Sequence, residues 1–492
     1  MVYFAEYFKC LRARTIVIEP EYVDRDFLDD HADYYVRCFH PYRRYCARLH
    51  FFESQFDQHS FQRLLEGDPG GPITQTALQM NNYLGFIIVK PLPEAIIGRS
   101  CLKHYPPDGG RRYFPTARTY SASLCGLKLE VETVAFQEQD TVAAACATSA
   151  LWSAFHCTGR LFQHEIPTPI SITRRATEKV PVYTRAVPSE GLALEQMAAA
   201  VRGVGLEPLL FNVEVDPVLL PWLAYAYIKA KIPCLMICSL HDCSSSSPDR
   251  LGLHAVTLTG FSLGRPNCPP VGGTGFPLRA SRIDELYAHD DQVGPFARMV
   301  FDGCQRNSDS LSTSWRSPSS GRYDVRACPQ SLLVPLYHKI RISYREVLDQ
   351  IIDLDASIRA LDKEVKQSNR KMGWGEFEWD LYLCTANDFK ASLFSEKAGL
   401  SGPYRRSILE RHLPRFLWLG KALSGNRPVL EFLFDATGIA RGKYLIMTIA
   451  YDADTVNKIC RAVRTHKSTI KAKYPDVLAP LQKMCSDSRS FF

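Results

Sequence analysis

The sequence contains no run of 18 apolar residues, so no segment has the length and composition of a membrane-spanning helix. Its first residues lack the basic region followed by an apolar region that marks a secretory signal peptide. No GxxxxGK[ST] loop, dinucleotide-binding glycine fingerprint or internal repeat occurs either. We therefore expect a cytoplasmic protein without a membrane interaction, and the common nucleotide-binding motifs are excluded.

Cysteine is present, but not in the arrangements that signal a disulfide framework or a zinc site. Sixteen cysteines are spread over the 492 residues, and no Cys-x-x-Cys pair occurs. Such a distribution favours reduced, buried thiols. The nearest approach to a metal-ligand cluster is Cys234, Cys238, His241 and Cys243, but its first two members lie in a strand-like run. We therefore expect no metal and no cofactor.

The overall charge is modest for a chain of this length. A net charge of +7, with 46% hydrophobic and 23% charged residues, is typical of an ordinary globular protein with several domains. Basic residues concentrate in the tail over residues 458–473, where Lys458, Arg461, Arg464, Lys467, Lys471 and Lys473 occur. No aromatic residues are interleaved to stack on bases, so a solvated helix face is favoured and nucleic-acid binding is the weaker interpretation.

Cys146 stands where an apolar helix is predicted to begin. From Ala147 to Phe155, apolar residues recur at intervals of three and four. A thiol at the start of a helix lies near the positive end of the helix dipole, which favours the nucleophilic thiolate. Cys146 is therefore a candidate nucleophile, against the alternative of a buried packing cysteine.

Two later stretches supply an imidazole and a carboxylate. His254 opens an alternating run that ends at Gly260 and is typical of a β-strand. A second short strand, residues 285–288, leads into Asp290 and Asp291 ahead of a Gly-Pro turn. A carboxylate at this position would hold the imidazole in one tautomer. Asp290 is preferred because it comes first after the strand, and Asp291 is the alternative third member.

The order cysteine, histidine, aspartate, with the cysteine on a helix and the others on strands, resembles that of the papain-like cysteine peptidases. Within that superfamily the sequence is most similar to the bacterial branch, the bacteriocin-processing double-glycine peptidases and their relatives. The resemblance covers roughly residues 114–304 and rests on a series of short motifs in the family's order, namely Gln139-Asp140, residues 167–172, residues 191–197 and residues 254–260. It implies an α+β fold with a papain-like core, in which a helix-rich half packs against an antiparallel sheet.

The resemblance also implies a donor to the oxyanion ahead of the cysteine. Papain-type enzymes carry a glutamine six positions before the nucleophile, whereas here Gln139 is seven before and Asp140 occupies the sixth position. Either the loop is one residue longer or that donor is missing. The backbone amide of Cys146 is then the safest oxyanion donor.

The chemistry implied by these residues is acyl transfer through a thioester. Cys146 would attack a carbonyl, His254 would take and return the proton, Asp290 would orient His254, and Gln139 would assist at the oxyanion. The expected substrate is a protein or peptide, cleaved at a peptide or isopeptide bond. Two alternatives stay open: an inactive peptidase-fold protein that binds or regulates a partner, and an acyltransferase on the same fold.

Composition and pattern divide the chain into four parts. These are an N-terminal mixed α/β unit over 1–115, the peptidase-like domain over 116–304, a Ser-rich linker over 305–329 and a C-terminal α+β unit over 330–492 with the basic tail. Helices are predicted over 22–48, 55–65, 146–158, 193–201, 217–229 and 340–366. Strands are predicted over 13–19, 50–52, 83–90, 120–134, 232–240 and 379–384, with a hairpin over 416–434.

Overall fold

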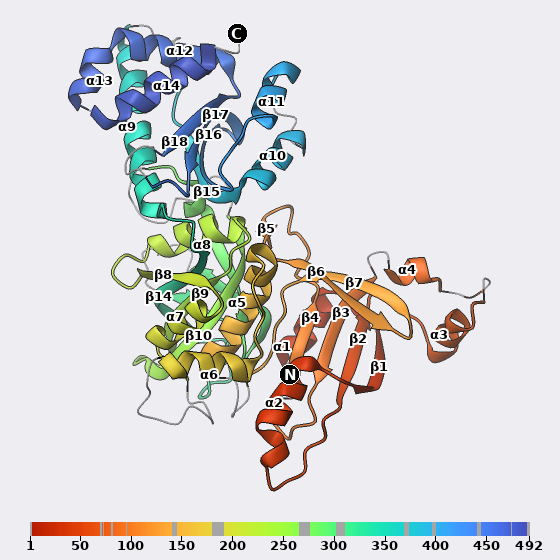
Figure 1. Cartoon of the computed structure of the whole chain (residues 1–492). Coiled ribbons are helices and arrows are strands. Elements are labelled where there is room, and N and C mark those ends of the chain that lie inside the picture. The colour runs from red at the N-terminus through yellow and green to blue at the C-terminus, as the bar shows by residue number, and fades with distance from the viewer. Residues whose placement is uncertain are drawn as a thin grey trace. The chain divides into compact units, whose positions relative to one another are not determined.

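The computed structural model has the α+β fold that the sequence predicts, with antiparallel sheets (Figure 1). It describes residues 2–489 except 69–70, 72, 80–81, 95, 140–144, 180–190, 265–275, 302–309, 369–372, 396–399, 440–443 and 474. The chain divides into two compact units. The first unit is Met1–Leu220, Lys231–Gly264 and Asp284–Tyr337, and the second unit is Pro221–Ala230, Arg265–Ile283 and His338–Phe492.

The first unit begins with a four-stranded antiparallel sheet. Its order is β1 (Thr15–Tyr22), β2 (Cys46–Phe52), β3 (Tyr83–Val89) and β4 (Ile97–Leu102). A separate hairpin follows, made of β6 (Arg118–Leu124) and β7 (Leu127–Thr133). The helices of this region are α1 (Val2–Cys10), α2 (Arg25–Asp33), η1 (Tyr35–Arg37), α3 (Gln58–Leu65) and α4 (Gln75–Gln79). The predicted strands and the helix over 55–65 are therefore present.

The long helix predicted over 22–48 is wrong. Its helical part is limited to α2, which is capped by Asp24, whose carboxylate accepts from the Phe27 amide at 3.1 Å. The end of the same segment instead becomes β2, a central strand between β1 and β3. The apolar residues of this segment fit both a helical and an alternating spacing. The end of the segment is a strand because it pairs with two neighbouring strands.

The centre of the first unit is an eight-stranded sheet that closes on itself. Its order is β11 (Ile283–Asp290), β12 (Gly294–Phe301), β13 (Leu311–Ser312), β14 (Val325–Tyr337), β9 (Cys234–Asp242), β10 (Asp249–Leu263) and β5 (Arg112–Tyr113), with β8 (Leu206–Asn212) paired to β14. Because β11 also pairs with β10, the six strands β9 to β14 form a closed ring. A closed ring leaves few exposed edges and fixes the directions of its side chains.

Three helices accompany this sheet: α5 (Cys146–Phe162), α6 (Pro169–Lys179) and α7 (Leu194–Gly203). Helix α5 is buried along almost its whole length. It is tied to β10 by the Thr257 hydroxyl, which donates to the Ala150 carbonyl at 2.6 Å. The sequence prediction that an apolar helix begins at Cys146 is therefore confirmed.

The predicted boundary near residue 115 does not separate two units in the structure. One hydrophobic cluster contains Tyr7 of α1, Phe51 of β2, Tyr105, and Tyr287 and Phe296 of the β11–β12 hairpin. The 1–115 region therefore shares its core with the central sheet, and both belong to the first unit.

The predicted Ser-rich linker over 305–329 is also corrected by the structure. Residues 302–309 lie outside the described part, but 310–329 contain β13 and the start of β14, both in the central sheet. Serine hydroxyls here satisfy buried groups: Ser317 donates to Asp242 at 2.7 Å. The polar composition reflects internal hydrogen bonding rather than a solvated connection.

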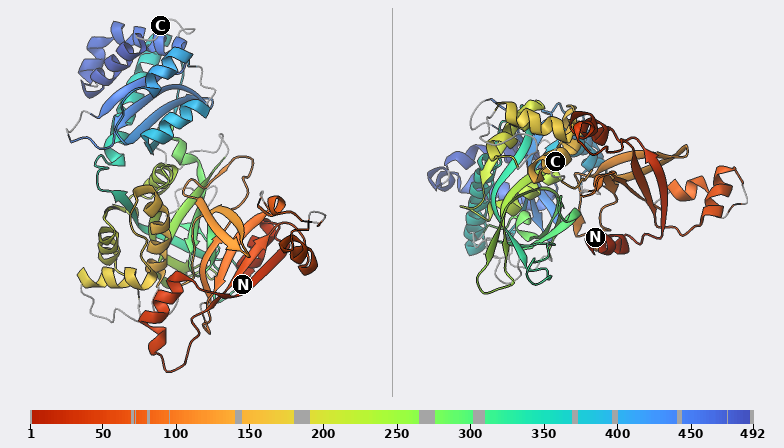
Figure 2. Two further views of the ribbon diagram at one scale, coloured as in Figure 1. Left: turned by 45° about the vertical axis from the view of Figure 1, so that its right-hand side comes forward. Right: turned by 90° about the horizontal axis from the view of Figure 1, so that it is seen from below.

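The second unit is a four-stranded sheet with helices on both faces (Figures 1 and 2). Its strands are β15 (Glu378–Thr385), β16 (Phe416–Ser424), β17 (Arg427–Asp435) and β18 (Leu445–Ala450), so the predicted hairpin over 416–434 is confirmed. One face packs on α10 (Ala386–Ser395) and α11 (Gly402–Leu409). The other helices are α9 (Tyr344–Ser368), α12 (Ala453–Thr465), α13 (Lys467–Lys473), η4 (Pro475–Val477) and α14 (Leu478–Arg489).

Most of α8 (Leu219–Lys229) and the 3₁₀ turn η2 (Arg279–Arg282) also belong to the second unit, although they come from earlier in the chain. Lys229 of α8 forms an ion pair with Asp380 of β15 at 2.7 Å, and Tyr225 donates to the same carboxylate. The second unit is therefore built from three chain segments, and not from the single stretch 330–492 that the sequence predicts.

The basic tail forms α12 and α13. Helix α12 buries Val456, Ile459 and Val463, and leaves Arg461 and Arg464 exposed. This is the amphipathic arrangement of a helix that packs on one side and is solvated on the other. Among the described residues, no helix has the length and apolar character needed to cross a membrane.

Candidate active site

Cys146 is the first residue of α5. The preceding residue, Ala145, has no side chain that could cap the helix, so no side-chain cap occupies the free amides of the first turn. Cys146 is half-buried, whereas Cys157 on the same helix is buried, and burial raises the pKa of Cys157 to about 12. Of these two thiols, Cys146 is the one that a reactant could approach.

His254 lies inside β10 rather than at its head. The strand begins at Asp249, because β10 pairs with β9 from Asp249↔Asp242 onward. His254 itself is opposite Cys238 and is 3% exposed. The predicted strand start is therefore wrong by five residues, and the imidazole is held more firmly than a residue at a strand end would be.

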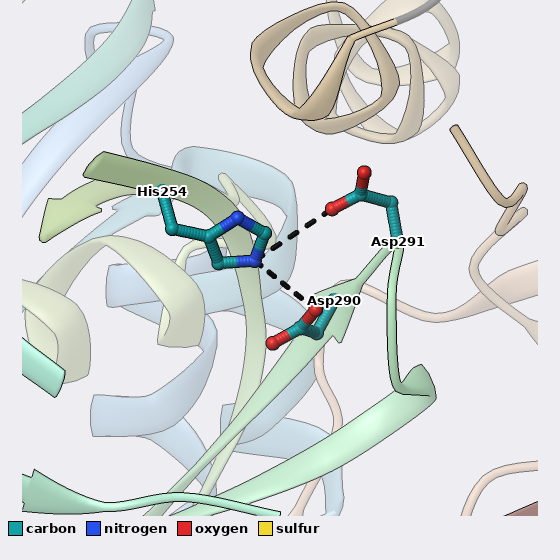
Figure 3. A group of neighbouring side chains, drawn as sticks. All are labelled: His254, Asp290 and Asp291. Carbon is teal, nitrogen blue, oxygen red and sulfur yellow. Dashed lines mark hydrogen bonds and ion pairs between the residues drawn. The ribbon is translucent and has the colours of Figure 1, made fainter. Parts of the chain in front are cut away.

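The carboxylates come from the end of β11 and the turn that follows. His254 Nε2 donates to Asp290 Oδ1 at 3.1 Å, while Asp291 Oδ1 lies 3.6 Å from the same nitrogen (Figure 3). Both acids are buried. The backbone amide of Gln292 also donates to Asp290 Oδ1, at 3.2 Å. Of the two acids, only Asp290 is within hydrogen-bonding distance of the imidazole.

Trp315 completes the surroundings of this pair, and sequence reasoning missed it. Its indole Nε1 donates to Asp290 Oδ2 at 2.6 Å. Its ring meets the His254 ring edge to face, with centroids 5.3 Å apart and planes at 79°. Trp315 therefore fixes the carboxylate and covers one side of the imidazole. Its position in a Ser-rich stretch gave no local signal, since the contact joins residues far apart in the chain.

The thiol and the acids act on His254 together. Burial favours the neutral ring, but the charge and hydrogen bond of Asp290, a side-chain hydrogen bond with Cys146 and the charge of Asp291 raise the pKa of His254 well above its usual value. Since Nε2 is engaged by Asp290, Nδ1 is the nitrogen left for the thiol. A protonated imidazole between a sulfur and a carboxylate is the arrangement that stabilises a thiolate.

The pKa values of the two acids shift in opposite directions. Burial alone would raise the pKa of Asp290, but the charge of His254 and the hydrogen bonds from His254 and Trp315 hold it below its usual value. For Asp291, burial and the charge of Asp290 outweigh the effect of His254 and raise the pKa to about 7. Neither carboxylate oxygen of Asp291 has a hydrogen-bond partner among the described residues.

The structure describes Gln139, the predicted oxyanion donor, but not the residues between it and Ala145. Gln139 is half-buried and, within the described residues, has no hydrogen bond to Cys146 or His254. Asp140 and the four residues after it lie outside the described part, so the length of this loop stays a prediction. Gln137, which sequence reasoning did not select, is 6% exposed, and its Nε2 has no hydrogen-bond partner among the described residues.

Two other buried histidines lack such surroundings. Burial lowers the pKa of His289 to about 3, and its Nδ1 accepts from the Phe296 amide at 3.3 Å. Burial and the neighbouring Arg118 hold the pKa of His156 well below its usual value. Both rings are therefore neutral packing residues, in contrast to His254.

One group in the described part of the chain has three potential metal ligands close together. Its members are His254, Asp290 and Asp291, whose ligand atoms all lie within 4.8 Å of one another. The cysteine-rich cluster considered from the sequence does not form such a group among the described residues: Cys234 and Cys238 are buried in β9. Burial raises the pKa of both thiols, which favours the neutral form that binds metals poorly.

An imidazole from β10 thus meets one carboxylate at the end of β11 and a second in the turn that follows, and the thiol that begins α5 acts on the same ring. No protein-family model matches the sequence, and no curated protein matches it.

Proposed function

We propose that this protein is a cysteine peptidase that cleaves a peptide or isopeptide bond through Cys146, His254 and Asp290. The observation that carries the proposal is a single buried imidazole with a hydrogen bond to a carboxylate on one nitrogen and a contact with a helix-start thiol. The resemblance in sequence order to the papain-like peptidases and their bacterial double-glycine branch supports the same assignment. So does a helix, begun by the cysteine, that is tied to an antiparallel sheet.

The reaction would proceed in two acyl-transfer steps. The Cys146 thiolate attacks the carbonyl carbon of the substrate, and the amide of Cys146 donates to the developing oxyanion. The imidazolium of His254 then gives its proton to the leaving amine, and a thioester remains on Cys146. His254 next takes a proton from water, whose oxygen attacks the thioester and releases the acid. Asp290 keeps the ring in the required tautomer throughout.

A peptide-library digestion tests this proposal. The wild-type protein, Cys146→Ala and Cys10→Ala are compared, because Cys10 is an exposed thiol outside the site. We expect cleavage by the wild type and by Cys10→Ala, and a loss of at least about a thousandfold in Cys146→Ala. Equal activity of Cys146→Ala, or no turnover and no acyl-enzyme by mass spectrometry in the wild type, would contradict the proposal.

The same experiment separates the alternatives. An acyl-enzyme that is released faster by added amines than by water would indicate an acyltransferase. A wild-type protein that retains library peptides without cleaving them, equally with Cys146→Ala, would indicate a binding protein.

A further inference from the structure

Two of the three ligand-atom separations in the group formed by His254, Asp290 and Asp291 are close to those of a tetrahedral metal site. With zinc bonds of about 2.0–2.1 Å to nitrogen and oxygen, ligand atoms of a tetrahedral site lie about 3.4 Å apart. The two separations from His254 Nε2, 3.1 Å to Asp290 Oδ1 and 3.6 Å to Asp291 Oδ1, lie on either side of this value (Figure 3). The ligand atoms of the group all lie within 4.8 Å of one another, so rotation of a carboxylate toward its neighbours would bring all three into reach of one ion.

Asp291 is the member whose carboxylate is least satisfied, because its nearest cationic atom, His254 Nε2, lies 3.6 Å away and beyond hydrogen-bonding distance. It is 4% exposed, both of its carboxylate oxygens are without a hydrogen-bond partner among the described residues, and one of them points at His254 Nε2. A buried carboxylate without partners is costly, and a cation is the kind of partner that removes that cost. Asp290 in turn has an outer support, because Trp315 holds its second oxygen, as is usual for metal-ligating carboxylates.

The ligand set selects the class of ion. One imidazole nitrogen and two carboxylate oxygens suit a transition ion such as Zn²⁺. Calcium and magnesium prefer all-oxygen surroundings, so they fit less well.

We propose that His254 Nε2, Asp290 and Asp291 bind a single Zn²⁺ ion, and that the bound ion switches off Cys146. The metal would take the lone pair of Nε2, and the proton that Nε2 now donates to Asp290 would leave to solvent. A neutral ring bound through Nε2 carries one proton, on Nδ1, so it could no longer act as the imidazolium that gives a proton to the leaving amine. Binding itself is independent of the proposed peptidase function, whereas the inhibitory consequence rests on it.

Metal binding is tested on full-length protein carrying Cys146→Ala, so that the site thiol cannot contribute. Isothermal titration of the chelator-treated protein with ZnCl₂ is compared with the same protein carrying Asp291→Asn. Asp249→Asn is the matched control, since Asp249 is an exposed aspartate on the strand that carries His254. We expect one site whose affinity falls at least tenfold in Asp291→Asn and is unchanged in Asp249→Asn.

Cobalt substitution shows whether cysteines elsewhere bind the ion, and thermal melting shows whether each variant stays folded. Co²⁺ bound to this group gives no thiolate charge-transfer band, so a strong band would assign the ion to cysteines elsewhere and overturn the proposal. Asp290→Asn is a second variant in case Asp291→Asn melts below the working temperature. Equal zinc affinity with and without these carboxylates would also overturn it.

The inhibitory step has its own readout. If peptidase activity is found, Zn²⁺ should inhibit the otherwise wild-type protein at least tenfold more strongly than the Asp291→Asn variant. Equal inhibition of the two would place the ion on the thiol and contradict the proposal. If no activity is found but zinc binds through Asp291, the proposed function fails and the metal site stands.

Discussion

The hydrogen bond from Trp315 to Asp290 should control catalysis without belonging to the reacting groups. Trp315→Phe removes the indole N–H, which now lies 2.6 Å from Asp290 Oδ2, and keeps an aromatic ring beside His254. The carboxylate loses one of the donors that hold its pKa down. Without that donor the carboxylate can turn away from the ring, so it should position the imidazole less precisely.

The size of the effect follows from the type of bond. A hydrogen bond to a charged group contributes about 1.5–3 kcal/mol, and about 1.4 kcal/mol corresponds to a factor of ten. We therefore expect kcat/KM to fall by about 10- to 150-fold if the transition state loses the full free-energy contribution of this hydrogen bond. The free energy of unfolding should fall by a similar 1.5–3 kcal/mol, approximately, because Asp290 Oδ2 is left buried without a donor.

The second unit offers a matched control for this substitution. Trp379 is buried, and its Nε1 donates to the buried carboxylate of Asp355 at 2.8 Å. Trp379→Phe should therefore lower stability comparably and leave kcat/KM unchanged. Steady-state kinetics and urea denaturation of both variants make the comparison. A Trp315→Phe protein with wild-type kcat/KM, destabilised like Trp379→Phe, would refute the reasoning.

Three further predictions concern single residues. Asp290→Asn should lower kcat/KM on the order of a thousandfold and Asp291→Asn much less, because only Asp290 is hydrogen-bonded to the imidazole; comparable losses measured kinetically would contradict this. Burial raises the pKa of Asp26 to about 6, whereas in the unfolded chain this carboxyl loses its proton near pH 4. The free energy of unfolding of the wild type therefore falls as the pH rises from about 4 through 6. Asp26→Asn should therefore gain up to about 2 kcal/mol over the wild type at pH 7.5 relative to pH 4.5 in denaturant titrations, and a pH-independent difference would be the opposing result. Gly85→Ala should cost at least about 3 kcal/mol, since φ is +108° and a Cβ would lie 1.9 Å from the Cys101 carbonyl oxygen; a melting curve like that of the wild type would exclude this.

The parts of the site that could be predicted from the sequence are those with a local pattern. The start of α5 at Cys146 follows from apolar spacing, and the strand before Asp290 follows from a short apolar run. Both patterns lie within about ten residues, and tertiary contacts reinforce them. The order of the three groups along the chain then suggested which side chains meet.

What could not be predicted depends on long-range pairing. Trp315 reaches Asp290 because β13 and β14 join the central sheet, yet its neighbours are mostly serines that suggest a linker. The segment over 22–48 fails for a related reason, since β2 is a strand only because β1 and β3 lie beside it. The burial of Asp291 likewise has no trace in a sequence where Asp-Asp before a turn is typical of a solvated loop.

Alkylation of Cys146 is the most direct measurement of whether the thiol and His254 work as a pair. At pH 6 an ordinary thiol with a pKa near 8.5 is only about 0.3% thiolate, and a neighbouring imidazolium favours the thiolate, which is the nucleophilic form. Allowing for the lower nucleophilicity of such a thiolate, iodoacetamide should label Cys146 about 10- to 100-fold faster in the wild type than in His254→Ala. The exposed thiols of Cys10 and Cys125 provide internal references in the same peptide maps. Equal labelling of Cys146 in both proteins at pH 6 would contradict the account.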